Sequence, residues 1–170
     1  MTSSFIKNAS GAIISDNKEF RYVLWRSWGN DLFSAGSKMI LFIGLNPSTA
    51  DATQDDPTLR RCIGFARTFE YNALYMVNLF AFRATDPRAM FISPDPVGPQ
   101  NNAWLQRLAL ASDVIVACWG SFGGAEARIR EVMAMLPDDK LFCLAVNGDG
   151  SPAHPLYLPK TSQLIKYPTQ

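Results

Sequence analysis

The chain has 170 residues, of which 48% are hydrophobic and 18% are charged, so its composition is that of a folded globular protein and excludes a mainly disordered one. A length of this order fits one domain, and neither a linker nor a repeat divides the chain. We therefore expect a single domain over residues 1–170, with an N-terminal strand or hairpin extension over 1–37 and a core over 38–159.

The formal net charge of +1 gives no general attraction to nucleic acid, whereas duplex-binding domains are often strongly basic. No apolar run approaches the roughly 18 residues of a membrane span. Residues 1–7 lack the apolar core of a signal peptide. We expect a cytoplasmic monomer that does not bind membranes.

The chain has three cysteines, which are widely spaced and embedded in apolar stretches. Their odd number and spacing favour buried free thiols over a disulfide, a zinc site or an iron–sulfur cluster. Asp51, Asp55 and Asp56 resemble a metal-binding cluster only superficially, because Asp56 before Pro57 is better explained as the start of a helix. We expect neither a metal nor a cofactor. The cysteines are Cys62, Cys118 and Cys143.

Apolar periodicity and turn residues predict alternating strands and helices. Asp56 and Pro57 supply the cap and the first residue of a helix, and Ser121 or a nearby residue is expected to cap a later one. The alternation predicts an α/β fold, a three-layer α/β/α sandwich with a mostly parallel central sheet. In chain order, we expect a strand or hairpin over 13–14 and 20–25, turns at 28–31 and 35–37, a strand over 38–44, a helix over 57–69, a strand over 73–79, a long proline-rich connection over 80–100, a helix beginning near 98–99, a strand over 113–118, a helix that buries apolar residues between 125 and 136, a strand over 140–146 and a turn at 147–150.

Short polar motifs stand at the ends of the apolar runs. In an open parallel α/β sheet the carboxyl ends of neighbouring strands open into one crevice, so residues at these ends converge even when they are far apart in the chain. The order of the motifs therefore predicts one shared pocket and favours a base- or nucleotide-binding enzyme. The motifs are Gly44-Leu45-Asn46-Pro47, Asn78, Trp119-Gly120-Ser121 and His154-Pro155.

These motifs resemble those of the uracil-DNA glycosylase superfamily and, within that circle, a bacterial and phage domain family of unknown function. The resemblance spans roughly Ile40 to Leu158. The first motif is similar to the Gly-x-Asn-Pro of the mismatch-specific members, in which the Asn holds the attacking water. Asn78 resembles the Asn that reads the pyrimidine edge. His154-Pro155 resembles the start of the motif that gives a catalytic His and then an apolar wedge.

The resemblance implies a uracil-DNA-glycosylase-like fold and assigns roles to individual residues. The implied partner is DNA, single- or double-stranded, or a free nucleotide or nucleobase. Arg83 is added as a DNA contact because of its charge, although a solvated face is the alternative. After His154-Pro155 the chain departs from the family's Ser-Pro, and no residue is assigned to stack on the base. The expected catalytic residues are Asn46 and His154, the expected base-binding residues are Gly44, Leu45, Pro47, Asn78 and Trp119, and the expected DNA-binding or wedge residues are Leu156, Tyr157, Ser121 and Arg83.

The residue types suit hydrolysis of an N-glycosidic bond, which passes through an oxocarbenium-like sugar and leaves negative charge on the departing base. His154 can donate a hydrogen bond to the departing oxygen. Asn78 offers a donor and an acceptor to the edge of uracil or thymine. Asn46 can orient a water but cannot take its proton. We therefore expect a DNA glycosylase-like enzyme acting on uracil or a modified pyrimidine.

Each of these residues also has a purely structural explanation. His154 beside prolines can be a surface or capping residue, and Asn46 before Pro47 is a common turn signal. Asn78 can satisfy backbone groups, and Trp119 is more often part of a core. Two other function classes stay open: a protein or non-DNA enzyme that binds a nucleoside, nucleotide or modified base in the same crevice, and a catalytically inactive interaction module on the same scaffold.

Overall fold

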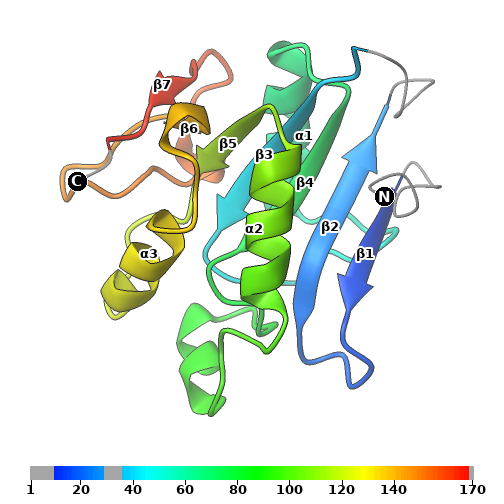
Figure 1. The fold of residues 1–170 in the computed structure, drawn as a ribbon, viewed down its shortest axis with the longest axis vertical. Helices are drawn as coiled ribbons and strands as arrows, with labels where there is room; N and C mark the ends of the chain where they lie inside the picture. Colours follow the sequence, from blue (N-terminus) through cyan, green and yellow to red (C-terminus); the bar gives the residue numbers. More distant parts are fainter. Residues whose placement is uncertain (1–9, 29–35, 169–170) are drawn as a thin grey trace.

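A mixed seven-stranded sheet organises the part of the chain that the computed structural model describes, residues 10–28 and 36–168. The strand order is β1-β2-β4-β3-β5-β6-β7 (Figure 1). The strands are β1 (Ser10–Ile14), β2 (Arg21–Ser27), β3 (Met39–Gly44), β4 (Ala73–Asn78), β5 (Val114–Ala117), β6 (Leu141–Cys143) and β7 (Ile165–Lys166). The α-helices are α1 (Pro57–Thr68), α2 (Asn101–Ala111) and α3 (Glu126–Met133), and the short 3-10 helices are η1 (Pro87–Ile92), η2 (Asp138–Lys140) and η3 (Pro155–Tyr157).

The α/β class is confirmed, but the sheet is mixed and not mostly parallel. The central strands β4, β3, β5 and β6 run parallel, whereas β1, β2 and β7 pair antiparallel with their neighbours. The difference arises because the predicted N-terminal hairpin joins the same sheet beside β4, and the end of the chain adds β7 beside β6. Within the described ranges, no helix is long and apolar enough to cross a membrane.

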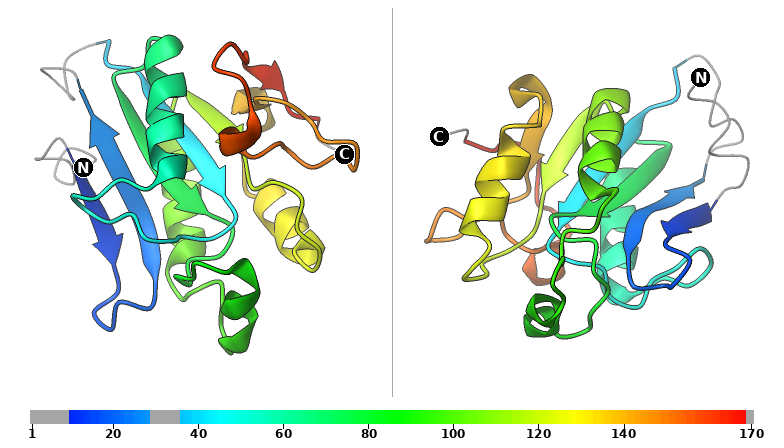
Figure 2. Two further views of the ribbon diagram at one scale, coloured as in Figure 1. Left: turned by 180° about the vertical axis from the view of Figure 1, so that it is seen from behind. Right: turned by 60° about the horizontal axis from the view of Figure 1, so that its bottom comes forward.

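The helices cover both faces of the sheet. In Figure 1, α2 and α3 lie in front of the sheet, and the reversed view in Figure 2 shows α1 on the other side. Successive residues of the central strands alternate between two apolar cores. On β3, Ile40 and Phe42 belong to the core under α1, whereas Leu41 and Ile43 belong to the core under α2 and α3. Burial on both faces explains why these strands are nearly continuous apolar runs.

Helix α1 has the limits that the sequence predicts. The Leu59 N–H donates to Asp56 Oδ1 at 2.8 Å, Pro57 is the first helical residue and Phe69 is the C-cap. The apolar face of the helix packs on the sheet, where Cys62 lies buried. All three cysteines are buried and free.

The start of α3 corrects the prediction that Ser121 or a nearby residue caps it with a side chain. The residue before the helix is Ala125, which makes no side-chain cap bond. The Gly124 N–H instead donates to the Glu126 carboxylate, at 3.2 Å to one oxygen and 3.1 Å to the other. Ser121 Oγ donates to Asp149 Oδ2 and so ties the loop after β5 to the turn at 147–150.

The β6 edge of the sheet also differs from the prediction. β6 covers only part of the expected strand over 140–146, because its partner β5 ends at Ala117, opposite Cys143. Val146 instead bridges Pro152 across the turn at 147–150. β7 has two residues and therefore no readable periodicity. The predicted turns at 28–31 and 35–37 fall mainly on residues 29–35, which lie outside the described residues.

Candidate functional site

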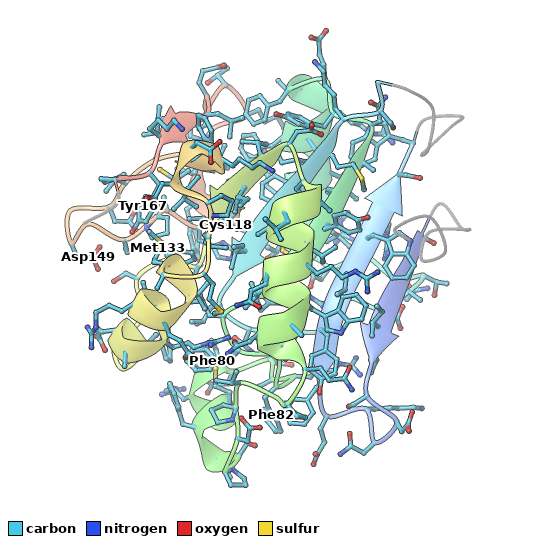
Figure 3. The ribbon with its side chains drawn as sticks, in the orientation of Figure 1. Phe80, Phe82, Cys118, Met133, Asp149 and Tyr167 are labelled. Atoms are coloured by element: carbon cyan, nitrogen blue, oxygen red, sulfur yellow. The ribbon has the colours of Figure 1, made fainter. Side chains whose placement is uncertain are left out.

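A pocket of about 150 Å³ lies where β3, β4 and β5 end. Gly44, Asn78 and Cys118, which end or directly follow these strands, lie on its wall. Side chains of a strand alternate between the two faces of the sheet. Gly44, Asn78 and Cys118 lie on the same face as the strand residues that pack under α1, so the pocket is on the α1 side of the sheet. Figure 3 marks Cys118 near the middle of the molecule. The start of α1 contributes Asp56, Thr58 and Leu59 to the wall.

The strand order explains why these strand ends meet. The chain passes from β3 to β4 on one side and later to β5 on the other side of β3. Connections that leave in opposite directions open a crevice at the carboxyl ends of the strands. Six residues to which the sequence assigns a role share the wall of this pocket. They are Gly44, Leu45, Asn46, Asn78, Trp119 and His154.

The backbone at the end of β4 is fixed from the far side of the sheet, and this places the side chain of Asn78. Asn101 Nδ2, fully buried on α2, donates to the carbonyl oxygens of Asn78 at 3.0 Å and Leu79 at 3.1 Å. Arg128 Nε donates to the same Leu79 oxygen at 2.7 Å. Asn78 is 3% exposed, and its Nδ2 has no hydrogen-bond partner among the described residues. That amide is therefore available to a ligand in the pocket.

Gly44 makes room for the Asn78 side chain. A Cβ added to Gly44 would stand 2.8 Å from Asn78 Oδ1, which is closer than two such atoms approach each other. The Asn78 side chain is the flexible partner of this contact. A side chain at position 44 would therefore displace the amide and leave the strands in place.

Gly44→Ala is expected to move the Asn78 amide and to keep the fold. Forcing a side chain off its rotamer costs about 0.5–1.5 kcal/mol, so the free energy of unfolding should fall by no more than this. The measurement is the Asn78 side-chain amide signal in an NMR spectrum. Gly64→Ala is the matched control, because a Cβ at Gly64 meets nothing within 4 Å. An Asn78 signal that is the same in both variants would contradict the contact.

Asn46 is tied down through its amide nitrogen. Its Nδ2 donates to Ala84 O at 2.8 Å and to Pro47 O at 3.2 Å. These bonds fasten the long connection after β4 onto the motif that follows β3. Because Nδ2 is occupied, Oδ1 is the atom of this side chain that can accept a hydrogen bond from a water or a ligand.

His154 is held in one tautomer. The Leu156 N–H donates to His154 Nδ1 at 3.3 Å, so the neutral ring carries its proton on Nε2. Burial lowers the pKa of His154 below its ordinary value of 6.5, and the negative charge of Asp56 acts in the opposite direction. At neutral pH the ring is therefore an uncharged N–H donor on the pocket wall.

The segment that carries His154 is anchored to α1. Arg61 Nε donates to Pro155 O at 3.3 Å, and its Nη2 donates to Leu158 O. The reversed view in Figure 2 shows η3 beside α1. The Gly120 N–H, in the loop after β5, donates to Pro152 O at 3.0 Å. The ring thus has a fixed position relative to the strand ends.

Two buried N–H groups of residues on the pocket wall have no hydrogen-bond partner within the described part of the chain. An unpaired buried donor costs about 1–3 kcal/mol, and native proteins leave few of them. His154 Nε2 adds a third donor to the same wall. The pocket is therefore suited to a ligand that offers acceptors. The unpaired groups are Arg21 Nε and Asn78 Nδ2, whereas the side chain of Trp119 packs in the core under α2 and α3, with its ring edge-on to Tyr167.

Two charged residues of the wall have no predicted role there. Arg21, from β2, is buried and lines the pocket. The sequence does not predict this, because an arginine within a strand is not a signal for a pocket. Asp56 is recognisable as a helix cap, and its Oδ1 has that role. The cap bond uses only one oxygen of the carboxylate. Because the Asp56-Pro57 motif is fully explained by the cap, the sequence gives no sign that Asp56 also lines the pocket.

Two of the predicted residues support the pocket without lining it. Pro47 is buried beside the wall, and its carbonyl accepts from the Ala84 N–H at 3.0 Å. Ser121 bonds to the Asp149 carboxylate, and this bond, with those from Ser151, lowers the pKa of Asp149 to about 2. Figure 3 shows Asp149 at the end of the molecule that carries Tyr167. Ser121 therefore fixes the turn that precedes His154.

The remaining predicted residues do not line the pocket. Leu156 and Tyr157 follow His154 on η3 and are 42% and 85% exposed. Arg83 Nη1 donates to Lys18 O at 3.3 Å, so this side chain braces the turn between β1 and β2. Within the described ranges, no group of three or more His, Cys, Asp or Glu side chains is placed to hold a metal ion.

The fold and the site define an α/β protein with a small, donor-rich pocket at the carboxyl ends of parallel strands. Residues 21–156 match the family described as "Protein of unknown function (DUF1643)", and the chain belongs to this family. The matched range includes the whole pocket wall, from Arg21 to His154, and leaves out β1 and β7. No curated protein and no solved structure matches the chain.

Proposed function

We propose that this protein is a DNA glycosylase-like enzyme, akin to the uracil-DNA glycosylase superfamily in fold and reaction, that hydrolyses the N-glycosidic bond of uracil or a modified pyrimidine. The observation that carries the proposal is that Asn46, Asn78 and His154 lie on the wall of one pocket. They supply a water holder, a reader of the base edge and a donor to the departing oxygen. Helices on both faces of the sheet are in keeping with the three-layer architecture that the resemblance implies.

The size of the pocket favours a single ring. A cavity of about 150 Å³ in an engineered protein binds benzene, and the volume here is also about 150 Å³. A pyrimidine has a six-membered ring, whereas a nucleotide adds a sugar and a phosphate that would have to lie outside. We therefore place the base in the pocket and the sugar at its mouth, the arrangement that results when a base is extruded from a strand.

In the proposed reaction the bond between the sugar carbon and the base nitrogen breaks, and its electron pair stays with the base. His154 donates from Nε2 to an oxygen of the base as that oxygen gains negative charge. Asn46 directs a water to the sugar carbon through Oδ1. The water oxygen bonds to that carbon, Asp56 takes the released proton and passes it to solvent, and solvent protonates the base anion.

Asp56→Asn tests the proton acceptor and keeps the helix cap, because Asn caps a helix start as well as Asp does. We expect turnover to fall only about tenfold, since an oxocarbenium-like transition state forms before the water has lost its proton. The free energy of unfolding should hardly change. Asp55→Asn is the matched control, because Asp55 pairs with Arg26 and does not line the pocket. Equal turnover in Asp56→Asn and the wild type would assign the proton to solvent.

Formation of abasic sites tests the proposed activity itself. The purified protein is incubated with oligonucleotides that carry uracil, mismatched thymine, hypoxanthine or a hypermodified pyrimidine, in single and double strands. Strand breakage after alkali then reports base loss. Abasic sites with the wild type but not with His154→Ala would support the proposal. No base loss from any substrate would contradict it.

A second candidate function is the binding of a free pyrimidine or nucleoside without DNA. The net charge of +1 favours it, because phosphate-driven binding relies on a basic surface. Affinity for oligonucleotides, measured at several salt concentrations, separates the two candidates. Phosphate contacts make affinity fall steeply with salt, whereas a free-base binder shows little affinity for the strand. A catalytically inactive module would bind its ligand and release no base.

A further inference from the structure

The β1–β2 hairpin turns one arginine into the pocket. The register shifts between Ile13, which lies opposite Val23, and Ile14, which lies opposite Arg21, so the strand holds one extra residue there. In a regular strand Arg21 and Val23 would face the same side of the sheet. The bulge instead places Arg21 on the side of Leu24, which faces α1 and lines the pocket.

Arg26, on the same strand, shows what an arginine with a structural role does in this fold. Its Nε pairs with Asp55 Oδ1 at 2.8 Å. Its Nη1 donates to Trp25 O at 2.8 Å and its Nη2 to Asp51 O at 2.7 Å. All three nitrogens are used inside the protein, and most of these bonds hold the loop before α1. Arg26 does not line the pocket.

Arg21 is buried as deeply as Arg26, with 4% of the residue exposed against 7%, but uses fewer of its donors. Its Nη1 donates to Ala50 O at 2.9 Å. Its Nε has no partner, and no carboxylate of the described residues lies within ion-pair distance of it. Burial lowers the pKa of Arg21 to about 10, so it is still a cation at neutral pH. A buried cation on a pocket wall is best satisfied by an acceptor of a ligand.

We propose that Arg21 binds the ligand of this pocket, and that the pocket selects a single-ring base whose edge presents hydrogen-bond acceptors and carries negative charge. The other unpaired group of the wall, Asn78 Nδ2, is also a donor, as is His154 Nε2. A ring edge made of carbonyl groups satisfies such a wall, whereas an amino group would meet donors. The inference rests on the proposed function, in which the departing base is such an anion, and adds Arg21 as a residue that stabilises it.

Binding of free pyrimidines to the whole protein tests this inference by isothermal titration calorimetry. The probes are barbiturate, an anion at neutral pH with carbonyl groups around its ring, uracil, which is neutral, and cytosine, in which an amino group replaces a carbonyl. We expect wild-type affinity to fall in this order, with barbiturate at least about tenfold tighter than cytosine. Cytosine binding that equals or exceeds barbiturate binding would overturn the inference.

Variants of Arg21 show whether this residue causes the preference. Arg21→Lys keeps the charge without the planar fork, and Arg21→Met removes the charge. Barbiturate affinity should fall about tenfold in Arg21→Lys and about a hundredfold in Arg21→Met, with little change for cytosine. Arg26→Lys is the matched control, because Arg21 and Arg26 both hold the loop before α1. Equal losses of barbiturate affinity in Arg21→Lys and Arg26→Lys would show that Arg21 acts only by holding the loop, and would overturn the inference.

The outcomes separate this inference from the proposed hydrolysis. If no abasic site forms but the barbiturate preference depends on Arg21, hydrolysis fails and the ligand assignment stands. If abasic sites form while Arg21→Lys keeps both turnover and barbiturate affinity, the ligand assignment fails and hydrolysis stands. Circular dichroism shows whether Arg21→Met folds. If it does not fold, Arg21→Lys and the wild-type order of affinities still decide whether Arg21 binds the ligand.

Discussion

His154→Ala is expected to lower turnover about a hundredfold to a thousandfold, which is the loss seen when one donor to a developing oxyanion is removed from an enzyme. The side chain belongs to neither apolar core, so the free energy of unfolding should change little. Single-turnover measurement of abasic-site formation gives the rate, and denaturant unfolding gives the stability. A variant that folds normally and keeps the wild-type rate would remove His154 from the mechanism.

His154→Gln is the matched variant, because a glutamine amide can place an N–H near the position of Nε2. It should recover part of the rate that alanine loses. The pH profile adds a second criterion. An imidazolium keeps its Nε2–H, but its protonated Nδ1 can no longer accept from the Leu156 N–H, so the ring loses the bond that holds it. Since burial lowers the pKa of His154 below 6.5, the wild-type rate should stay level above pH 6.5 and fall only as the pH drops through that lower pKa. His154→Gln has no ring to protonate and should lack this part of the fall.

The central strands and α1 are predictable because each carries a strong local signal. The parallel strands are buried on both faces and therefore appear as apolar runs, and Asp56-Pro57 marks a helix start. The start of α3 at Glu126 has no side-chain cap, so a rule based on capping residues misplaces it. The limits of β6 and the presence of β7 depend on which distant segments pair. No local pattern encodes that pairing.

The residues of the pocket also divide into those with a local sequence signal and those placed by the pairing of distant segments. The sequence places Gly44, Asn78 and His154 at strand ends or in a turn, and the geometry of parallel strands is enough to predict that they meet. Arg21 enters the pocket only because β1 and β2 pair with a bulge, and register depends on two strands together. For Asp56 the sequence predicts the helix cap but not the place on the pocket wall, since the cap uses only one of its two oxygens.

Asn78→Asp is expected to turn base preference from uracil toward cytosine. The wild-type amide can accept from the pyrimidine N3–H and donate from Nδ2 to O4, and this Nδ2 is buried without a protein partner. A carboxylate replaces the donor with a second acceptor, which repels O4 of uracil but accepts from the N4 amino group of cytosine. Leaving a buried group unpaired costs about 1–3 kcal/mol. With the gain for cytosine, the ratio of the two rates should change by about a hundredfold.

Competition between uracil and cytosine in otherwise identical oligonucleotides measures that ratio directly. Asn102→Asp is the matched control, because Asn102 lies outside the pocket wall and its Nδ2 donates to Glu131 Oε1 at 3.0 Å, where a second carboxylate would be repelled. It should lower the free energy of unfolding and leave the ratio as it is. If Asn78→Asp keeps the wild-type preference for uracil, Asn78 does not read the base. The pocket would then have to recognise its ligand through Arg21 and His154 alone.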